Sequence, residues 1–89
     1  MAILNQERIN ELSTNQALNF ENALYLLRAG KKVCRANWKN VKYIEMQKPD
    51  EFSKMKQAYI FAVPLDNQPC PWTPSATDLF AEDWSMYNG

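Results

Sequence analysis

The chain has 89 residues, ten acidic and ten basic side chains, two cysteines and no histidine. A chain this short forms one domain and buries only about 60–65% of its unfolded surface, so we expect a marginal core that self-association would help. The lack of histidine removes the usual general base and the Ser or Cys triad, and with two distant cysteines it argues against zinc. The zero net charge disfavours nucleic-acid binding, and no apolar run approaches the roughly 20 residues that cross a membrane.

The first part of the chain, residues 1–18, is expected to be an extension that precedes a single domain at residues 19–89. Four side chains in it have the spacing of one to two turns of amphipathic helix: Leu4, Arg8, Ile9 and Leu12. Because so short a helix is unstable alone, we expect the extension either to dock on a partner or to fray.

The clearest element is a helix over residues 20–29. Asn19 can cap its first turn, Glu21 places a negative charge near the positive end of the helix dipole, and Gly30 suits the left-handed position that ends a helix. Four apolar residues recur at helical spacing and indicate packing on the core: Phe20, Ala23, Leu24 and Leu27.

Three strands are expected to follow the helix, over residues 31–38, 41–47 and 57–63. Residues 49–56 are either a loop or one poor helical turn, and residues 65–71 are rich in turn formers. The connections are too short for helical crossovers, so the strands must pair antiparallel. With a final strand at residues 83–87, the fold class is α+β: one main helix packed on an antiparallel sheet of three to four strands.

The first expected strand carries a charge that needs an explanation. Alternation places Arg35 with Val33 on one face and Cys34 on the other, without settling which face meets the helix. A buried guanidinium needs partners, so Arg35 either contacts a ligand phosphate or forms an internal salt bridge, for which Asp78 or Asp83 would serve.

The stretch from residue 71 to residue 84 is the most distinctive part of the chain. Two prolines restrict the backbone on either side of Trp72, so its ring should be held in place. Ser75 and Asp78 have the spacing of a capping box, which predicts a short helix after them. Trp84 lies in the final strand, and we expect it to belong to the core.

The side chains in these segments suit recognition of a small nucleotide better than catalysis. Trp38 and Trp72 can stack on a base, and Asn37 can hydrogen-bond to a base edge. Nine basic residues stand against three acids between positions 28 and 56, so Arg35 and the lysines can meet phosphate. Asp78 can accept hydrogen bonds from ribose hydroxyls. We expect no metal site, no cofactor and no catalytic residue.

Two segments, residues 19–38 and 71–84, carry a specific combination of residues. It consists of Asn19, Phe20, Glu21, Ala23, Leu24, Leu27, Gly30, Lys31, Val33, Arg35 and Trp38, then Pro71, Trp72, Pro74, Ser75, Asp78, Leu79, Ala81, Glu82, Asp83 and Trp84. In this combination the chain resembles a small bacteriophage family that is associated with inhibition of the bacterial Thoeris defence system. Members of that family act as sponges: they bind a cyclic ADP-ribose isomer without cleaving it. They fold as a helix on an antiparallel sheet and form homotetramers with ligand pockets at protomer interfaces.

The resemblance implies a non-catalytic protein of the host bacterial cytoplasm that sequesters a cyclic ADP-ribose isomer and binds neither nucleic acid nor membrane. Its ligand-binding residues would be Arg35, Asn37, Trp38, Trp72, Ser75 and Asp78. Trp72, and Trp38 beside it, would stack on the adenine, Arg35 would engage the diphosphate, and the last two would take ribose hydroxyls. Two other functions stay open: an enzyme that cleaves the signal with Asp78 or Glu82, and an inhibitor that docks on a defence protein through its aromatic surface.

Overall fold

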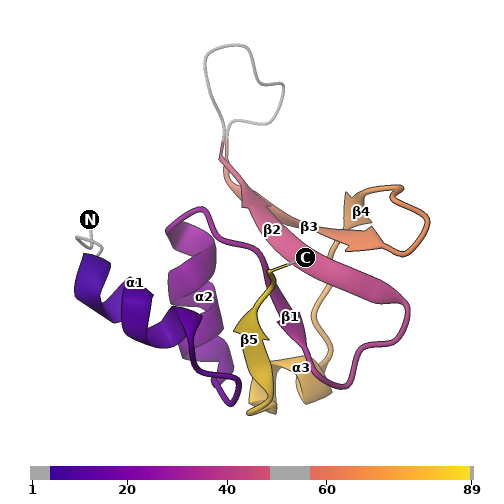
Figure 1. Ribbon diagram of the computed structural model, residues 1–89. Coiled ribbons are helices and arrows are strands. Elements are labelled where there is room, and N and C mark those ends of the chain that lie inside the picture. The colour runs from indigo at the N-terminus through magenta and orange to yellow at the C-terminus, as the bar shows by residue number, and fades with distance from the viewer. Residues whose placement is uncertain (1–4, 49–56, 89) are drawn as a thin grey trace.

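The computed structural model describes residues 5–48 and 57–88 and has an α+β fold, as the sequence predicts (Figure 1). This part of the chain contains three helices and five strands. They are α1 (Gln6–Ser13), α2 (Phe20–Arg28), β1 (Val33–Arg35), β2 (Val41–Gln47), β3 (Tyr59–Pro64), β4 (Cys70–Pro71), α3 (Ala76–Phe80) and β5 (Trp84–Met86). The predictions for Leu4 and for residues 49–56 lie outside the described residues. No helix within the described ranges is long and apolar enough to span a bilayer.

Helix α2 confirms the clearest prediction from the sequence. The Asn19 side chain accepts a hydrogen bond from the backbone N–H of Asn22 at 3.0 Å, and Glu21 lies in the first turn. Gly30 has a φ of +84°, the left-handed conformation that ends the helix. Leu26, which the predicted apolar stripe leaves out, is fully buried together with Leu27.

Helix α1 corrects the expectation that the extension docks on another molecule or frays. Ile9 and Leu12 are buried in the same core as α2. The backbone N–H of Asn5 donates to the Tyr25 hydroxyl at 2.6 Å, and the Arg8 guanidinium lies 4.2 Å from the centre of the Tyr25 ring. A short helix is marginal in water, but tertiary contacts of this kind stabilise it.

The five strands form one antiparallel sheet in the order β4-β3-β2-β1-β5. The last strand in the sequence therefore lies beside the first one, where Arg35 pairs with Trp84. The sheet has five strands, whereas the sequence predicts three to four, and the additional strand is β4. The sequence does not predict this strand, because its two residues, one of them a proline, show no alternation of apolar and polar side chains. Strand β1 is shorter than predicted because the N–H of Trp38 donates to the Arg35 carbonyl at 3.2 Å, which turns the chain away.

The core lies between the helices and one face of the sheet. Its fully buried sheet residues include Val33, Ile44 and Trp84, which pack against Leu26 and Leu27 of α2. Val33 and Arg35 are both buried while Cys34 is half-buried, so the face with Val33 and Arg35 is the one that meets the helices. An arginine thus enters the apolar side of the sheet, and its partners define the candidate site.

Candidate functional site

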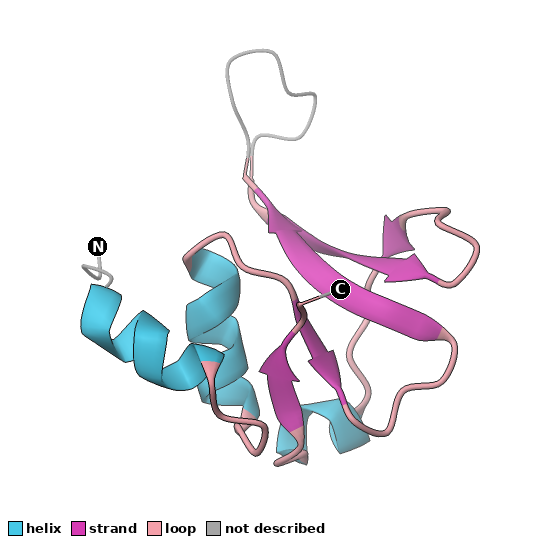
Figure 2. Ribbon diagram, viewed as in Figure 1, coloured by secondary structure: helices cyan, strands magenta, loops and turns pink. Residues whose placement is uncertain are grey.

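The six side chains predicted from the sequence come from segments that meet at one end of the sheet. Arg35 is the last residue of β1, and Asn37 and Trp38 follow in the turn after it. Helix α3 lies beside the ends of β1 and β5, and Trp72 precedes it (Figure 2). The structure therefore brings together residues that are far apart in the sequence.

Arg35 forms an internal salt bridge with both candidate acids. Its Nε atom lies 2.8 Å from Oδ1 of Asp83, and its Nη1 atom lies 2.8 Å from Oδ1 of Asp78. Hydrogen bonds to Asp83 and then to Asp78 raise the pKa of Arg35 further above its ordinary value. We call these three residues the arginine cluster. Because it holds one positive and two negative groups, the cluster is net negative at neutral pH. Direct contact of Arg35 with a ligand stays a prediction.

Asp78 is the most highly connected member of the arginine cluster. Its Oδ1 atom also accepts a hydrogen bond from the indole Nε1 of Trp38 at 3.4 Å, and its Oδ2 atom accepts from the Ser75 backbone N–H at 3.1 Å. The Ser75 hydroxyl and the Asp78 backbone N–H complete the predicted capping box. Burial opposes ionisation of Asp78, but hydrogen bonds from Arg35, Ser75 and Trp38 outweigh it and lower the pKa of this carboxyl. The carboxylate is therefore fully engaged and charged at neutral pH.

Asp83 also belongs to the site. The sequence had indicated it only as one of two alternative partners for Arg35. Its Oδ2 atom accepts from the backbone N–H of Asn37 at 3.3 Å, and its carbonyl accepts from the N–H of Ala36 at 3.2 Å. These bonds fix the turn that presents the exposed Asn37 side chain. In the sequence, Asp83 could be noticed only as an acidic residue beside Trp84. The pairing of β5 with β1 is what brings it to Arg35.

Four aromatic rings pack together beside the arginine cluster, and we call them the aromatic cluster: Phe20, Trp38, Trp72 and Trp84. Ring centres lie 5.1 Å apart for Trp38 and Trp84, 5.4 Å for Phe20 and Trp84, and 6.0 Å for Phe20 and Trp72. Trp84 is fully buried, which confirms its predicted place in the core, and its Nε1 donates to the Asp78 carbonyl at 3.0 Å. The two clusters are therefore joined through Asp78, which bonds to two indoles.

Trp72 is held by more than its flanking prolines. Its backbone N–H donates to the Ile60 carbonyl at 3.1 Å, which ties it to β3. Its half-buried ring lies 6.4 Å from the Trp38 ring and 6.1 Å from the Trp84 ring, measured between centres. One part of the ring thus packs on the core and another part reaches solvent.

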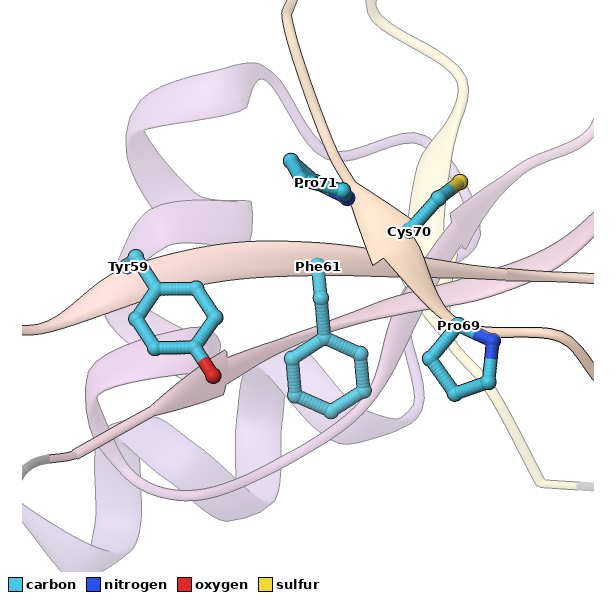
Figure 3. A pocket seen from close by; sticks show the side chains of 5 residues that line it. All are labelled: Tyr59, Phe61, Pro69, Cys70 and Pro71. Atoms are coloured by element: carbon cyan, nitrogen blue, oxygen red, sulfur yellow. The ribbon is translucent and has the colours of Figure 1, made fainter. Parts of the chain in front are cut away.

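A small open cavity of about 210 Å³ lies along β3 and β4. Its lining is formed by Tyr59, Phe61, Pro69, Cys70 and Pro71, and Figure 3 shows the Tyr59 and Phe61 rings pointing the same way from β3. None of the six predicted site residues lines this cavity.

Residues 5–48 and 57–88 contain no group of three or more Cys, Asp or Glu side chains that could hold a metal ion. Both cysteines are free thiols: Cys34 is half-buried, with its sulfur 3.8 Å from the Ser85 hydroxyl, and Cys70 is exposed. The chemistry of the site therefore rests on carboxylates, one guanidinium, hydroxyl and amide groups, and indole rings.

Comparison with known families identifies the domain. The family model described as the Thoeris anti-defense 2-like (Tad2-like) domain matches residues 18–87. The chain belongs to this family. The Tad2-like match begins at Leu18, whose backbone pairs with Trp84, and runs through β5. No curated protein matches the sequence.

The family match confirms the resemblance and the anti-defence role that it implies. All six predicted site residues lie inside the Tad2-like segment, whereas α1 precedes it. Both clusters lie within the matched region too. In this anti-defence domain, the half-buried Trp72 therefore lies beside the arginine cluster.

Proposed function

We propose that this Tad2-like domain binds a cyclic ADP-ribose isomer, the Thoeris signal, and sequesters it without cleaving it. The observation that carries the proposal is the half-buried ring of Trp72, which is fixed before any ligand arrives. A fixed aromatic ring loses little conformational entropy on stacking, and base stacking contributes about 1–3 kcal/mol. The family match supplies the biological setting.

The proposed contacts assign one part of the ligand to each of the six predicted side chains. Trp72, with Trp38 beside it, stacks on the adenine, and the exposed Asn37 side chain hydrogen-bonds to its edge. Ser75 and Asp78 take ribose hydroxyls by exchanging hydrogen bonds of the capping box, because each Asp78 carboxylate oxygen already accepts two. The Nη2 atom of Arg35 donates to no acceptor within the described residues, so it remains for the diphosphate. The two carboxylates at Arg35 limit that contact, because they repel an approaching anion.

The state of Asp78 favours binding over cleavage. A general acid must be protonated at the working pH, and the lowered pKa of this carboxyl leaves it ionised. Each of its oxygens already accepts hydrogen bonds, which makes it a weak base as well. Sequestration requires affinity and enough copies of the protein, and it requires no turnover. We further propose that the protein works as a homotetramer in the host cytoplasm, with ligand bound between protomers.

A second function, direct inhibition of a defence protein, is favoured by one observation. Phe80 at the end of α3 is 83% exposed, and its neighbour Leu79 is 43% exposed. Large apolar side chains exposed at neighbouring positions are available for contact with another protein.

The test is to incubate the protein with lysate that contains an activated Thoeris sensor, repurify it, denature it by heat and analyse the released small molecules by mass spectrometry. Sequestration predicts the intact cyclic signal in the released fraction. Recovery of a ring-opened product would replace the proposal with an enzyme. Co-purification of a Thoeris protein without any small molecule would support the second function instead.

A further inference from the structure

One carboxylate of the arginine cluster has hydrogen-bonding capacity that the fold does not use. A carboxylate offers about four lone-pair sites to hydrogen-bond donors. Each oxygen of Asp78 already accepts two hydrogen bonds. Within residues 5–48 and 57–88, the Asp83 carboxylate accepts one bond at each oxygen, from Arg35 at 2.8 Å and from the backbone N–H of Asn37 at 3.3 Å. The acceptor sites that remain in the cluster are therefore on Asp83.

Asp83 is also the member of the cluster that solvent reaches most easily. The exposed fraction of the side chain is 33% for Asp83, 14% for Asp78 and 8% for Arg35. The residue is nevertheless held in place, because the Asp83 carbonyl also accepts from the N–H of Ala36 at 3.2 Å. A molecule that arrives from solvent thus meets a fixed carboxylate with free lone pairs.

The position of Asp83 suits the sugar of a stacked nucleotide. Asn37, which donates its N–H to Asp83, directly precedes Trp38 in the turn after β1. The Trp38 ring centre lies 6.4 Å from that of Trp72. Because the ribose of a nucleotide is attached directly to its base, a base stacked on these rings brings its ribose hydroxyls close to them. A hydroxyl donates hydrogen bonds, and a bond to a carboxylate is stronger than a bond to a neutral acceptor.

We propose that Asp83 is a further ligand-binding residue, which accepts a hydrogen bond from a ribose hydroxyl and rejects a ribose that carries a phosphate at that position. A hydroxyl that donates to Asp83 displaces no hydrogen bond of the fold, whereas one that donates to Asp78 must displace a donor of the capping box. A phosphate there is repelled, because two carboxylates lie beside it and one guanidinium offsets only part of their charge. The inference rests on the proposed function, and it names the class of nucleotide selected: one with free ribose hydroxyls.

The experiment compares the wild type with Asp83→Asn, which keeps the shape of the side chain and removes its charge. The probes are the cyclic ADP-ribose isomer recovered from the activated lysate and analogues of it, each with a single ribose hydroxyl removed or phosphorylated. Calorimetric titration gives the affinity of each protein for each probe. Asp83→Asn should bind the unmodified isomer about tenfold more weakly than the wild type does, because a hydrogen bond to a charged acceptor is lost.

The analogues distinguish direct contact from support of the turn. In the wild type, removal of one particular hydroxyl should weaken binding about tenfold, and phosphorylation of that hydroxyl should weaken it about 100-fold. In Asp83→Asn, removal of the same hydroxyl should change the affinity by less than about threefold, since its acceptor is already gone. If Asp83 only supports the turn, its replacement weakens the binding of all probes by one common factor.

The matched control is Asp66→Asn, which makes the same chemical change at an exposed residue. The Asp66 Oδ1 atom also accepts a backbone N–H, from Gln68 at 3.0 Å, and this variant should bind every probe as the wild type does. Thermal melts establish that each variant is folded. If Asp83→Asn does not fold, NMR of the isotope-labelled wild type gives the same test. The carboxyl carbon resonance of Asp83 should shift with the unmodified isomer, and should shift less with the one analogue that lacks the bonded hydroxyl.

The results separate this inference from the proposed function. The inference alone is overturned if Asp83→Asn binds the unmodified isomer as tightly as the wild type does, or if it weakens all probes by a common factor. An Asp83 carboxyl resonance that responds equally to every probe overturns it too. Sequestration is unaffected by these outcomes, because the wild type still binds the isomer. If no cyclic nucleotide is recovered from the wild type, the proposed function fails, and the inference fails with it.

Discussion

Replacement of Trp72 by alanine tests the candidate site most directly. Since removal of a buried tryptophan costs about 3–5 kcal/mol and only the smaller part of Trp72 is exposed, its replacement should cost about 2–4 kcal/mol of stability. A domain of 89 residues has a free energy of unfolding of about 4–13 kcal/mol, so the variant should remain folded. Loss of base stacking, at about 1–3 kcal/mol, should then weaken ligand binding by roughly tenfold to a hundredfold.

Calorimetric titration beside a thermal melt measures both effects of Trp72→Ala. Trp72→Phe should keep part of the affinity, because a smaller ring still stacks. Phe80→Ala is the matched control: it removes an aromatic ring that is 83% exposed and should change neither stability nor affinity. A folded Trp72→Ala protein with unchanged affinity would refute the stacking role and would remove the main reason to place the ligand here.

Three further predictions concern the arginine cluster and the end of α2. Asp78→Asn should lower the free energy of unfolding by about 3–5 kcal/mol in urea titrations, because it removes a largely buried carboxylate that bonds to Arg35, Trp38 and Ser75. Asp83→Asn should cost about 1 kcal/mol, because the Asp83 side chain is a third exposed. The lowered pKa of Asp78 means that its contribution to stability is present above the unfolded pKa near 4 and is lost as the pH falls below it; urea midpoints that stay constant from pH 7 to pH 3 would contradict this. Gly30→Ala should cost about 1–2 kcal/mol through its positive φ alone, since nothing lies within 4 Å of the added methyl group, and a thermal melt without a shift would show the reasoning to be wrong.

Elements with strong local signals could be predicted from the sequence. Asn19 and Gly30 mark the two ends of α2, and the capping residues Ser75 and Asp78 mark the start of α3. The alternating pattern of β2 predicted its bounds, residues 41–47, without error. In each case the interactions that decide the structure lie within a few residues of one another, so the sequence contains the information directly.

Features that depend on distant residues could not be predicted in the same way. The sequence left open whether Arg35 meets a ligand or an acid, and it offered Asp78 and Asp83 as alternatives, whereas the fold brings both acids to it. Helix α1 was expected to dock elsewhere or fray because its stability comes from α2 rather than from its own eight residues. The six site residues were named from their chemistry and from the family resemblance, and their roles toward a ligand remain predictions.

The pairing of Leu18 with Trp84 has a consequence for how the domain folds. The central residue of the core comes near the end of the described chain, yet it contacts Leu18 and Phe20 at the beginning of the matched domain. Closing a loop between residues so far apart in the sequence costs conformational entropy before the contacts form. Domains dominated by contacts between residues distant in the sequence therefore fold slowly. During synthesis α2 and the β2–β3 hairpin emerge before Trp84, and the apolar surface that Trp84 covers stays exposed until then. Completion of the core is therefore among the last events in the folding of this protein.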